Sequence, residues 1–195
     1  ASQKLPADSF VFCSFIASYK LTAQWFDLWL EILSNCPNSV LWLGVRNSFT
    51  KKNLLDRASC KSLADRIFFA NRVSSKADHL ARLKLADLAL DTPFFNGMTT
   101  THDALLAGVP VLTKEGRSFP EMVCPGLMKY LNLEELVAKN DQDFLNKAIE
   151  LYSNKENLIS LRQKCSHLNA SPVLKASRAV KDLEKVYLRL VKSAK

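Results

Sequence analysis

The chain has 195 residues, of which 48% are hydrophobic and 24% charged, and its formal net charge at pH 7 is +8. This composition is that of an ordinary globular domain rather than a disordered chain, and no apolar run approaches the roughly 18 residues that span a bilayer. The positive charge favours anionic partners, but the basic residues are too scattered for a nucleic-acid interface, so we expect neither nucleic acid nor a membrane as partner.

The cysteines exclude two further classes of protein. Five cysteines are an odd number, they are widely spaced, and no two form a C-x-x-C pair. This argues against a disulfide framework and against a zinc site, so we expect a reducing compartment, the cytosol or the nucleus. The start of the chain, ASQKLPADSF, lacks the basic head and apolar run of a signal peptide and is interpreted as the edge of an excised domain.

Strands and helices are predicted to alternate through the first two-thirds of the chain. The short aromatic run 10–15 (FVFCSF) indicates a buried strand, and Thr22 is expected to cap a helix with apolar residues at helical spacing. Further strands are predicted at 39–43, 66–70, 88–90 and 109–113, with intervening helices near 51–63, from the N-cap Ser75 through 85, and at 100–107.

The remaining pattern is helical. Helices are predicted at 119–128, 141–152, 155–168 and 173–191, and the basic residues of the last one recur at three- and four-residue steps, as on a solvated face. The alternation before them predicts βαβ units and a Rossmann-like parallel sheet flanked by helices, an α/β fold. Ligands bind such sheets beyond the carboxyl ends of the strands, which directs attention to the loops after Phe15, Ala70, Leu90 and Thr113.

The loop after the fourth strand has the composition of an anion site. In LDTPFFNGMTTTHDALLAGVPVLT (90–113), Gly97 is expected to permit a backbone conformation that other residues resist. Thr99, Thr100 and Thr101 follow at a predicted helix N-terminus, where free amides and the helix dipole favour a phosphate. Asp103, one turn later, could accept hydrogen bonds from ribose hydroxyls. Ordinary helix capping explains the threonines as well, so both interpretations stay open.

Two other segments, the loop after the first strand and the helix after the third, carry basic residues. Lys20 follows the first strand and could neutralise a diphosphate, or be a surface lysine. His79 and Arg82 lie three residues apart on one side of a helix, where they could bind a phosphate or sugar oxygen and a base carbonyl, or serve packing. Lys76 near the start of that helix has the same two interpretations.

The segment 141–143 (DQD) fits the D-x-D pattern with which some glycosyltransferases bind a metal. It follows Lys139-Asn140 and opens a predicted helix, where acidic residues interact favourably with the dipole. We interpret it as a helix start and expect no metal and no other cofactor.

Three stretches together resemble one family. NSVLWL (38–43), KADHLARLKLADLALDTPFFNGMTTTHDALLAGVPVLT (76–113) and LVAKN (136–140) are similar to the nucleotide-binding lobe of the O-linked N-acetylglucosamine (O-GlcNAc) transferases. The resemblance extends over essentially the whole chain, residues 1–195, as a single nucleotide-sugar-binding lobe. It implies the C-terminal half of a GT-B glycosyltransferase, inverting and metal-independent, that transfers N-acetylglucosamine from UDP-N-acetylglucosamine to Ser or Thr of intracellular proteins.

The resemblance also implies residue roles. The lysine at the position of Lys20 is catalytic, because it neutralises the diphosphate leaving group. The segment matching Ser74, Ser75 and Lys76 contacts the uracil, as does the arginine matching Arg82. The positions of His79, Met98, Thr99 and Thr100 lie at the diphosphate or sugar, and Asp103 holds the ribose.

Two departures from the family pattern leave alternatives open. The family usually has glutamine at the position of Ala17 and histidine at that of Met98, and both add polar contacts near the diphosphate or sugar. The plant-type protein O-fucosyltransferases share this lobe and use GDP-fucose, so they are one alternative. A non-catalytic nucleotide-binding or interaction module is the other.

The resemblance further implies that other parts of the protein are needed for transfer. The family carries a second Rossmann-like lobe and tetratricopeptide repeats before this lobe, and these bind protein acceptors. We therefore expect this chain alone to bind UDP and to transfer little or no sugar, and its last helix to pack toward the other lobe.

Overall fold

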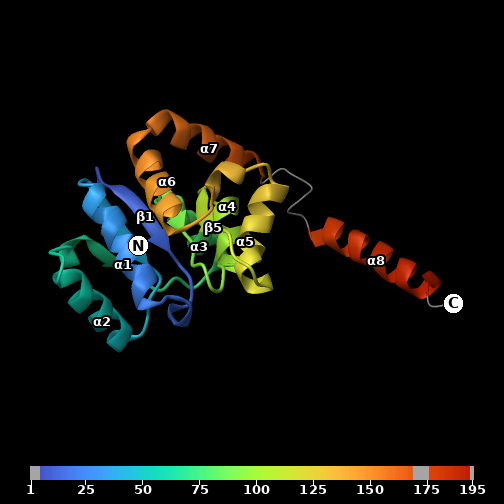
Figure 1. Ribbon diagram of the computed structural model, residues 1–195, viewed down its shortest axis with the longest axis horizontal. Coiled ribbons are helices and arrows are strands. Elements are labelled where there is room, and N and C mark those ends of the chain that lie inside the picture. Colours follow the sequence, from blue (N-terminus) through green and yellow to red (C-terminus); the bar gives the residue numbers. More distant parts are fainter. Residues whose placement is uncertain (1–4, 169–175, 194–195) are drawn as a thin grey trace.

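The computed structural model describes residues 5–168 and 176–193 as a parallel α/β body followed by a separate helix (Figure 1). The body is built on one sheet in the order β3-β2-β1-β4-β5-β6, and every pair of neighbouring strands is parallel. The strands are β1 (Phe10–Ser14), β2 (Ser39–Leu43), β3 (Ile67–Phe69), β4 (Leu88–Leu90), β5 (Val111–Lys114) and β6 (Val137–Ala138). This is the Rossmann strand order, which confirms the predicted fold class.

The central strands are buried on both faces, which explains their continuous apolar sequences. All five residues of β2 are buried, and so are four of the five in β1. The sixth strand was not predicted, because two residues are too short to show a strand pattern. β6 forms where Thr113 pairs with Val137 and Lys114 with Ala138.

The described body contains seven α-helices, and the two for which the sequence predicts a cap begin there. The seven are α1 (Ala23–Asn35), α2 (Ser48–Ser59), α3 (Lys76–Leu83), α4 (Thr99–Leu106), α5 (Phe119–Tyr130), α6 (Asp141–Ser153) and α7 (Lys155–His167), with short 3-10 turns η1 (Ser18–Lys20), η2 (Ala64–Arg66) and η3 (Glu134–Leu136). The Thr22 side chain accepts from the amide of Trp25 at 3.2 Å, and Ser75 accepts from that of Asp78 at 3.0 Å. The predicted bounds 51–63 for α2 are wrong, since Asn47 caps the helix earlier.

Helices pack on both faces of the sheet. Right-handed crossovers place α1 and α2 on one face and α3, α4 and α5 on the other. The apolar side of α1 is buried as predicted, and α6 packs against α1 and β5. α7 packs on α4 and α6 and is the last helix of the body.

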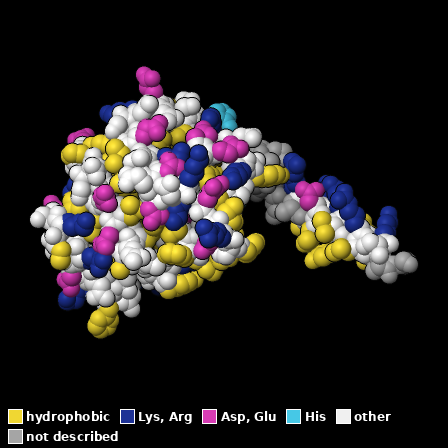
Figure 2. All heavy atoms as spheres, in the orientation of Figure 1, with side chains coloured by type: hydrophobic (Ala, Val, Ile, Leu, Met, Phe, Trp, Pro, Cys, Tyr) yellow, Lys and Arg dark blue, Asp and Glu magenta, His cyan; other side chains and the backbone are white. Residues whose placement is uncertain are grey.

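The last helix, α8 (Ala176–Ser193), extends away from the body (Figure 1). Figure 2 shows hydrophobic side chains along one side of α8 and Lys and Arg along another. The predicted basic face is exposed, but so is the apolar side, where Leu183 is 50% and Leu190 59% exposed. The predicted start at residue 173 lies outside the described residues. None of the helices in the described part of the chain is both long and apolar enough to cross a bilayer.

Candidate functional site

The strand order reverses between β1 and β4, and this point locates the candidate site. Chain connections run outward in opposite directions from these two adjacent strands, which leaves a crevice beyond their carboxyl ends. The residues that follow β1 lead to Lys20, and those that follow β4 form the loop 91–98. The structure therefore brings together two of the segments in which the sequence predicts a ligand.

Lys20 lies at the end of η1 and points into the loop after β4. Its ammonium donates to the backbone oxygen of Asn96 at 2.8 Å and lies 4.0 Å from the centre of the Phe95 ring. Partial burial lowers the pKa of Lys20 below its usual value of 10.5, and the charge of Asp91 acts in the opposite direction. The lysine is thus a positive group held against a turn of backbone at the crevice.

The loop after β4 packs tightly at Gly97. A Cβ on Gly97 would lie 2.5 Å from Oγ1 of Thr101 and 2.7 Å from Oγ1 of Thr100, so any other residue here would require these side chains to move. The expected reason, an unusual backbone conformation, is wrong: among the described residues, Gly97 is not one of those with positive φ. The left-handed residue is instead Met98, with φ 47°, which is uncommon for a residue with a side chain.

The threonines begin α4 as predicted. Thr99 is the exposed first residue of the helix, and Thr100 is half-buried and donates through its hydroxyl to the backbone oxygen of Gly97 at 2.8 Å. Met98 occupies the N-cap position without a capping side chain. The N-terminus of α4 is therefore joined to the same loop that holds Lys20. Ala17, the other departure from the family pattern, is exposed just before η1.

Asp103 joins α4 to α3 through two predicted site residues. Its buried carboxylate forms an ion pair with Lys76 and lies 3.4 Å from Nε2 of His79. Arg82 donates from Nε to Nδ1 of His79 at 3.2 Å and packs 4.7 Å above the ring of Phe15. Because Nδ1 accepts, the proton of a neutral His79 is on Nε2, facing Asp103. The four polar residues form one continuous network.

A cavity of about 380 Å³ lies beside this network. It opens beyond the carboxyl ends of β1, β2 and β3, and its lining includes Ser75, Lys76, His79, Arg82 and Arg46. Ser74 lines a neighbouring hollow of about 730 Å³ with Arg72 and Arg82. The predicted site residues thus form two adjoining groups: Lys20 with the loop and the start of α4, and the network on α3 and α4 with its cavity.

Comparison with known proteins identifies the family. The family model described as "Glycosyl transferase family 41" matches residues 1–183. The chain belongs to glycosyl transferase family 41.

The similar proteins within this family are much longer than this chain. A Caenorhabditis elegans protein named UDP-N-acetylglucosamine–peptide N-acetylglucosaminyltransferase is 36% identical over 84% of this chain, which covers 14% of that protein. An Arabidopsis thaliana protein given the same name, as probable, is 33% identical over 95% of this chain and 19% of its own length. An O-GlcNAc transferase of Thermobaculum terrenum, a solved structure, superposes on 97% of this chain with a TM-score of 0.87 and 26% identity, over 39% of that chain.

The D-x-D segment of this family 41 domain has the structural role expected of it. Asp143 accepts from the backbone amide of Lys139 at 2.8 Å, and its own amide donates to the side chain of Asn140 at 2.9 Å. The segment is therefore the first turn of α6, and Asn140 caps it. No cluster of three or more His, Cys, Asp or Glu side chains suited to a metal occurs among residues 5–168 and 176–193. Independence from metal remains a prediction.

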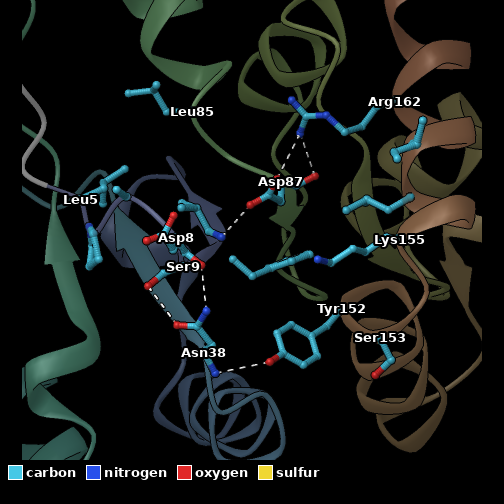
Figure 3. Close-up of a pocket in the computed structure, with 16 residues that line it drawn as sticks. Leu5, Asp8, Ser9, Asn38, Leu85, Asp87, Tyr152, Ser153, Lys155 and Arg162 are labelled. Carbon is cyan, nitrogen blue, oxygen red and sulfur yellow. Dashed lines mark hydrogen bonds and ion pairs between the residues drawn. The ribbon is translucent and has the colours of Figure 1, made fainter.

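A larger cavity, of about 1030 Å³, lies at the opposite edge of the sheet, near the amino ends of the strands (Figure 3). Its polar groups are mostly paired with one another. Arg162 donates to the backbone of Ala86 and Asp87, Asp87 accepts from the amide of Val11 at 2.8 Å, and the Tyr152 hydroxyl accepts from Asn38 at 3.3 Å. These bonds fix the strand starts, so the candidate functional site is the group of residues at the carboxyl edge.

Two residues of the site were missed in the sequence analysis. Asp91 and Asn96 are buried in the loop after β4, at 2% and 0% exposure, and they anchor it. The amide of Asn96 bridges the backbone of Thr92 and Cys124, with its side-chain nitrogen donating and its oxygen accepting. An acidic residue directly after an apolar strand is the one signal in the sequence for Asp91.

His79 is expected to titrate below pH 6.5. Burial is the main cause of its lowered pKa, and the charge of Arg82 adds to it, while Asp103 opposes both. Because the folded-state pKa lies below the unfolded value, His79 favours folding above pH 6.5, and this contribution falls as the pH falls toward the folded-state pKa. Carbon-detected NMR of the imidazole between pH 5 and 8 measures the midpoint. A midpoint above 6.5 contradicts the geometry, since it requires Asp103 to outweigh burial and Arg82.

Proposed function

We propose that the chain is the donor-binding lobe of an inverting, metal-independent protein O-GlcNAc transferase. The observation that carries the proposal is the position of Lys20, which is held on the loop joined to the N-terminus of α4. The same helix carries Asp103, which pairs with Lys76 and His79 in the wall of the 380 Å³ cavity. A positive group, a helix N-terminus and a polar cavity in sequence suit a diphosphate followed by a nucleoside.

Each group then has a role in the proposed reaction. The hydroxyl oxygen of the acceptor Ser or Thr bonds to the anomeric carbon as the bond to the UDP oxygen breaks. The hydroxyl proton is released to solvent, and negative charge grows on the departing diphosphate. Lys20 and the start of α4, with Thr99 and Thr100, stabilise that charge. Asp103 accepts hydrogen bonds from the ribose, and Arg82 with residues 74–76 binds the uracil. Met98 lies at the sugar side of the diphosphate.

The remaining parts of the protein are also proposals. This chain spans 14% and 19% of the two curated relatives and 39% of the bacterial structure. We propose that a second lobe and tetratricopeptide repeats bind the protein acceptors, in the cytosol or the nucleus. The exposed apolar side of α8 suits a contact with that second lobe. Without these parts the chain is expected to bind UDP but to transfer little or no sugar.

Calorimetric titration of the chain with UDP, UDP-N-acetylglucosamine and GDP-fucose tests the proposal. Binding of both UDP ligands and not of GDP-fucose supports it. Binding of GDP-fucose alone identifies the fucosyl branch. That outcome is compatible with Met98, which stands where the O-GlcNAc transferases usually have histidine. Heat from none of the three favours a non-catalytic interaction module. Appreciable sugar transfer to a protein acceptor by this chain alone contradicts the proposed need for a second lobe.

A further inference from the structure

Asp91 is a buried carboxylate at the carboxyl end of β4 with no role in the proposed reaction. It follows β4 directly and is 2% exposed. One oxygen, Oδ1, accepts from the amide of Gly97 at 2.7 Å, and the other, Oδ2, accepts from the hydroxyl of Thr113 at 2.8 Å. Its backbone oxygen accepts from the indole of Trp25 at 2.9 Å. The residue therefore ties β4, β5, α1 and the loop together.

The groups around this carboxylate are suited to its charged form. Burial raises the pKa of Asp91, while the hydroxyl of Thr113, the backbone amides of Thr92 and Gly97 and the thiol of Cys124 all hold it down. Each of these partners donates, and a carboxylate accepts without donating. Hydrogen bonds to the charged form stabilise that form, so the surroundings offset part of the cost of burial.

Asp91 is connected to Lys20 in two ways. Gly97, whose amide Asp91 holds, is bonded directly to Asn96, whose backbone oxygen holds the ammonium. The charge of Asp91 also acts on Lys20, where it opposes the effect of burial on the lysine pKa. Among residues 5–168 and 176–193, Asp91 is the charged side chain that acts in this way on Lys20, and the thiol of Cys124 is the other titratable group that interacts with Asp91.

We propose that Asp91 is the positioning residue of this site: its carboxylate fixes the loop that holds Lys20 and places a negative charge within that loop. The role deepens the proposed function, on which its consequence for UDP rests. A lysine that is partly desolvated binds a diphosphate only while it stays protonated. Asp91 thus keeps Lys20 both in place and charged without contacting the ligand itself.

Asp91→Asn separates charge from packing. The amide oxygen can still accept from Gly97, and the amide nitrogen can donate to the hydroxyl of Thr113, so the hydrogen bonds can persist while the charge is lost. Lysine side chains labelled by reductive ¹³C-methylation are followed by NMR from pH 7 to 12, and Lys20→Arg assigns the Lys20 signal. The expected result is a lower titration midpoint of Lys20 in D91N than in the wild type. An unchanged midpoint in a folded D91N overturns the proposal.

Thr113→Val is the matched control. It removes a hydrogen bond to the same carboxylate but leaves its charge, so the Lys20 midpoint is expected to stay that of the wild type. The same variant loses a donor that stabilises charged Asp91, so the titration midpoint of the Asp91 carboxyl is expected to move to higher pH. A T113V variant that lowers the Lys20 midpoint as D91N does overturns the proposal, because packing alone then explains the shift.

A measurement on the unmodified residue covers the case in which D91N does not fold. As the wild type is acidified, the amide resonance of Gly97 and the labelled methyl signal of Lys20 are expected to change with one shared midpoint, that of Asp91. Separate midpoints overturn the proposal.

Binding of UDP gives a further readout. As the pH is raised, D91N is expected to lose its affinity for UDP at a lower pH than the wild type does. A wild type that binds no UDP refutes the proposed function, while the NMR titrations still decide the role of Asp91.

Discussion

Lys20→Ala is expected to weaken UDP binding by roughly tenfold to a hundredfold. Hydrogen bonds to a charged group contribute about 1.5–3 kcal/mol, and about 1.4 kcal/mol corresponds to a factor of ten. The lysine is partly buried and fixed by the backbone oxygen of Asn96, so its ammonium is already positioned before a ligand arrives. Titration calorimetry with UDP at pH 7.5 measures the effect. Uridine, which lacks the diphosphate, is expected to bind both proteins equally.

Two variants make the Lys20 result specific. Lys52→Ala removes an exposed lysine on α2 that pairs with Asp56, so it changes the net charge equally but is expected to leave UDP affinity unaltered. Lys20→Arg keeps the charge in a planar group that does not match the single oxygen of Asn96. Its UDP affinity is therefore expected to lie between those of K20A and the wild type. Unchanged UDP affinity in K20A removes Lys20 from the diphosphate role.

The backbone of the fold could be predicted from the sequence because its signals are local. Apolar runs mark β1 and β2, and Thr22 and Ser75 mark helix starts through hydrogen bonds to amides three residues away. β6 gave no such signal. Its two residues become a strand only because β5 provides a partner, which is a tertiary effect.

The candidate site could be predicted only in part. Lys20, His79 and Arg82 were grouped by the resemblance to the family and by the rule for strand ends. Which groups pair with one another depends on side-chain distances that a sequence does not carry. Nothing in the sequence shows that Asp103 pairs with Lys76, or that Phe95 covers Lys20. Gly97 illustrates the limit. The sequence marks the residue as special, but the need for glycine comes from the close approach of two threonine hydroxyls, which the sequence does not show.

The internal pairing of the network has a consequence for the nucleoside. Asp103 already has partners, so ribose hydroxyls must share its carboxylate with His79 or replace Lys76. Replacing Lys76 is the easier change, because the lysine side chain is 56% exposed and returns to water, whereas that of His79 is only 17% exposed. Lys76, once released, still lines the 380 Å³ cavity, which we propose as the site of the uracil.

Asp103→Asn is therefore expected to weaken UDP binding about fivefold. An amide offers one acceptor oxygen and no charge, and hydrogen bonds to neutral groups contribute about 1 kcal/mol less than those to charged ones. The loss is expected to depend on the ribose: 2′,3′-dideoxy-UDP should bind the wild type and D103N with nearly equal affinity. Calorimetric titration of both proteins with both ligands gives a double-mutant cycle, in which the coupling term reports the contact between Asp103 and the ribose.

Asp78→Asn provides the matched control for that cycle. Asp78 is an exposed carboxylate on the same helix as His79, and it pairs locally with the Ser75 hydroxyl at 2.7 Å. Its substitution changes the net charge by the same amount. Equal losses of UDP affinity in D78N and D103N would mean that Asp103 acts through its charge and not through a contact with the ribose. A D103N variant that loses the same affinity for UDP and for the dideoxy ligand places the ribose elsewhere. Asp103 would then be a structural residue that joins α3 to α4 through Lys76 and His79.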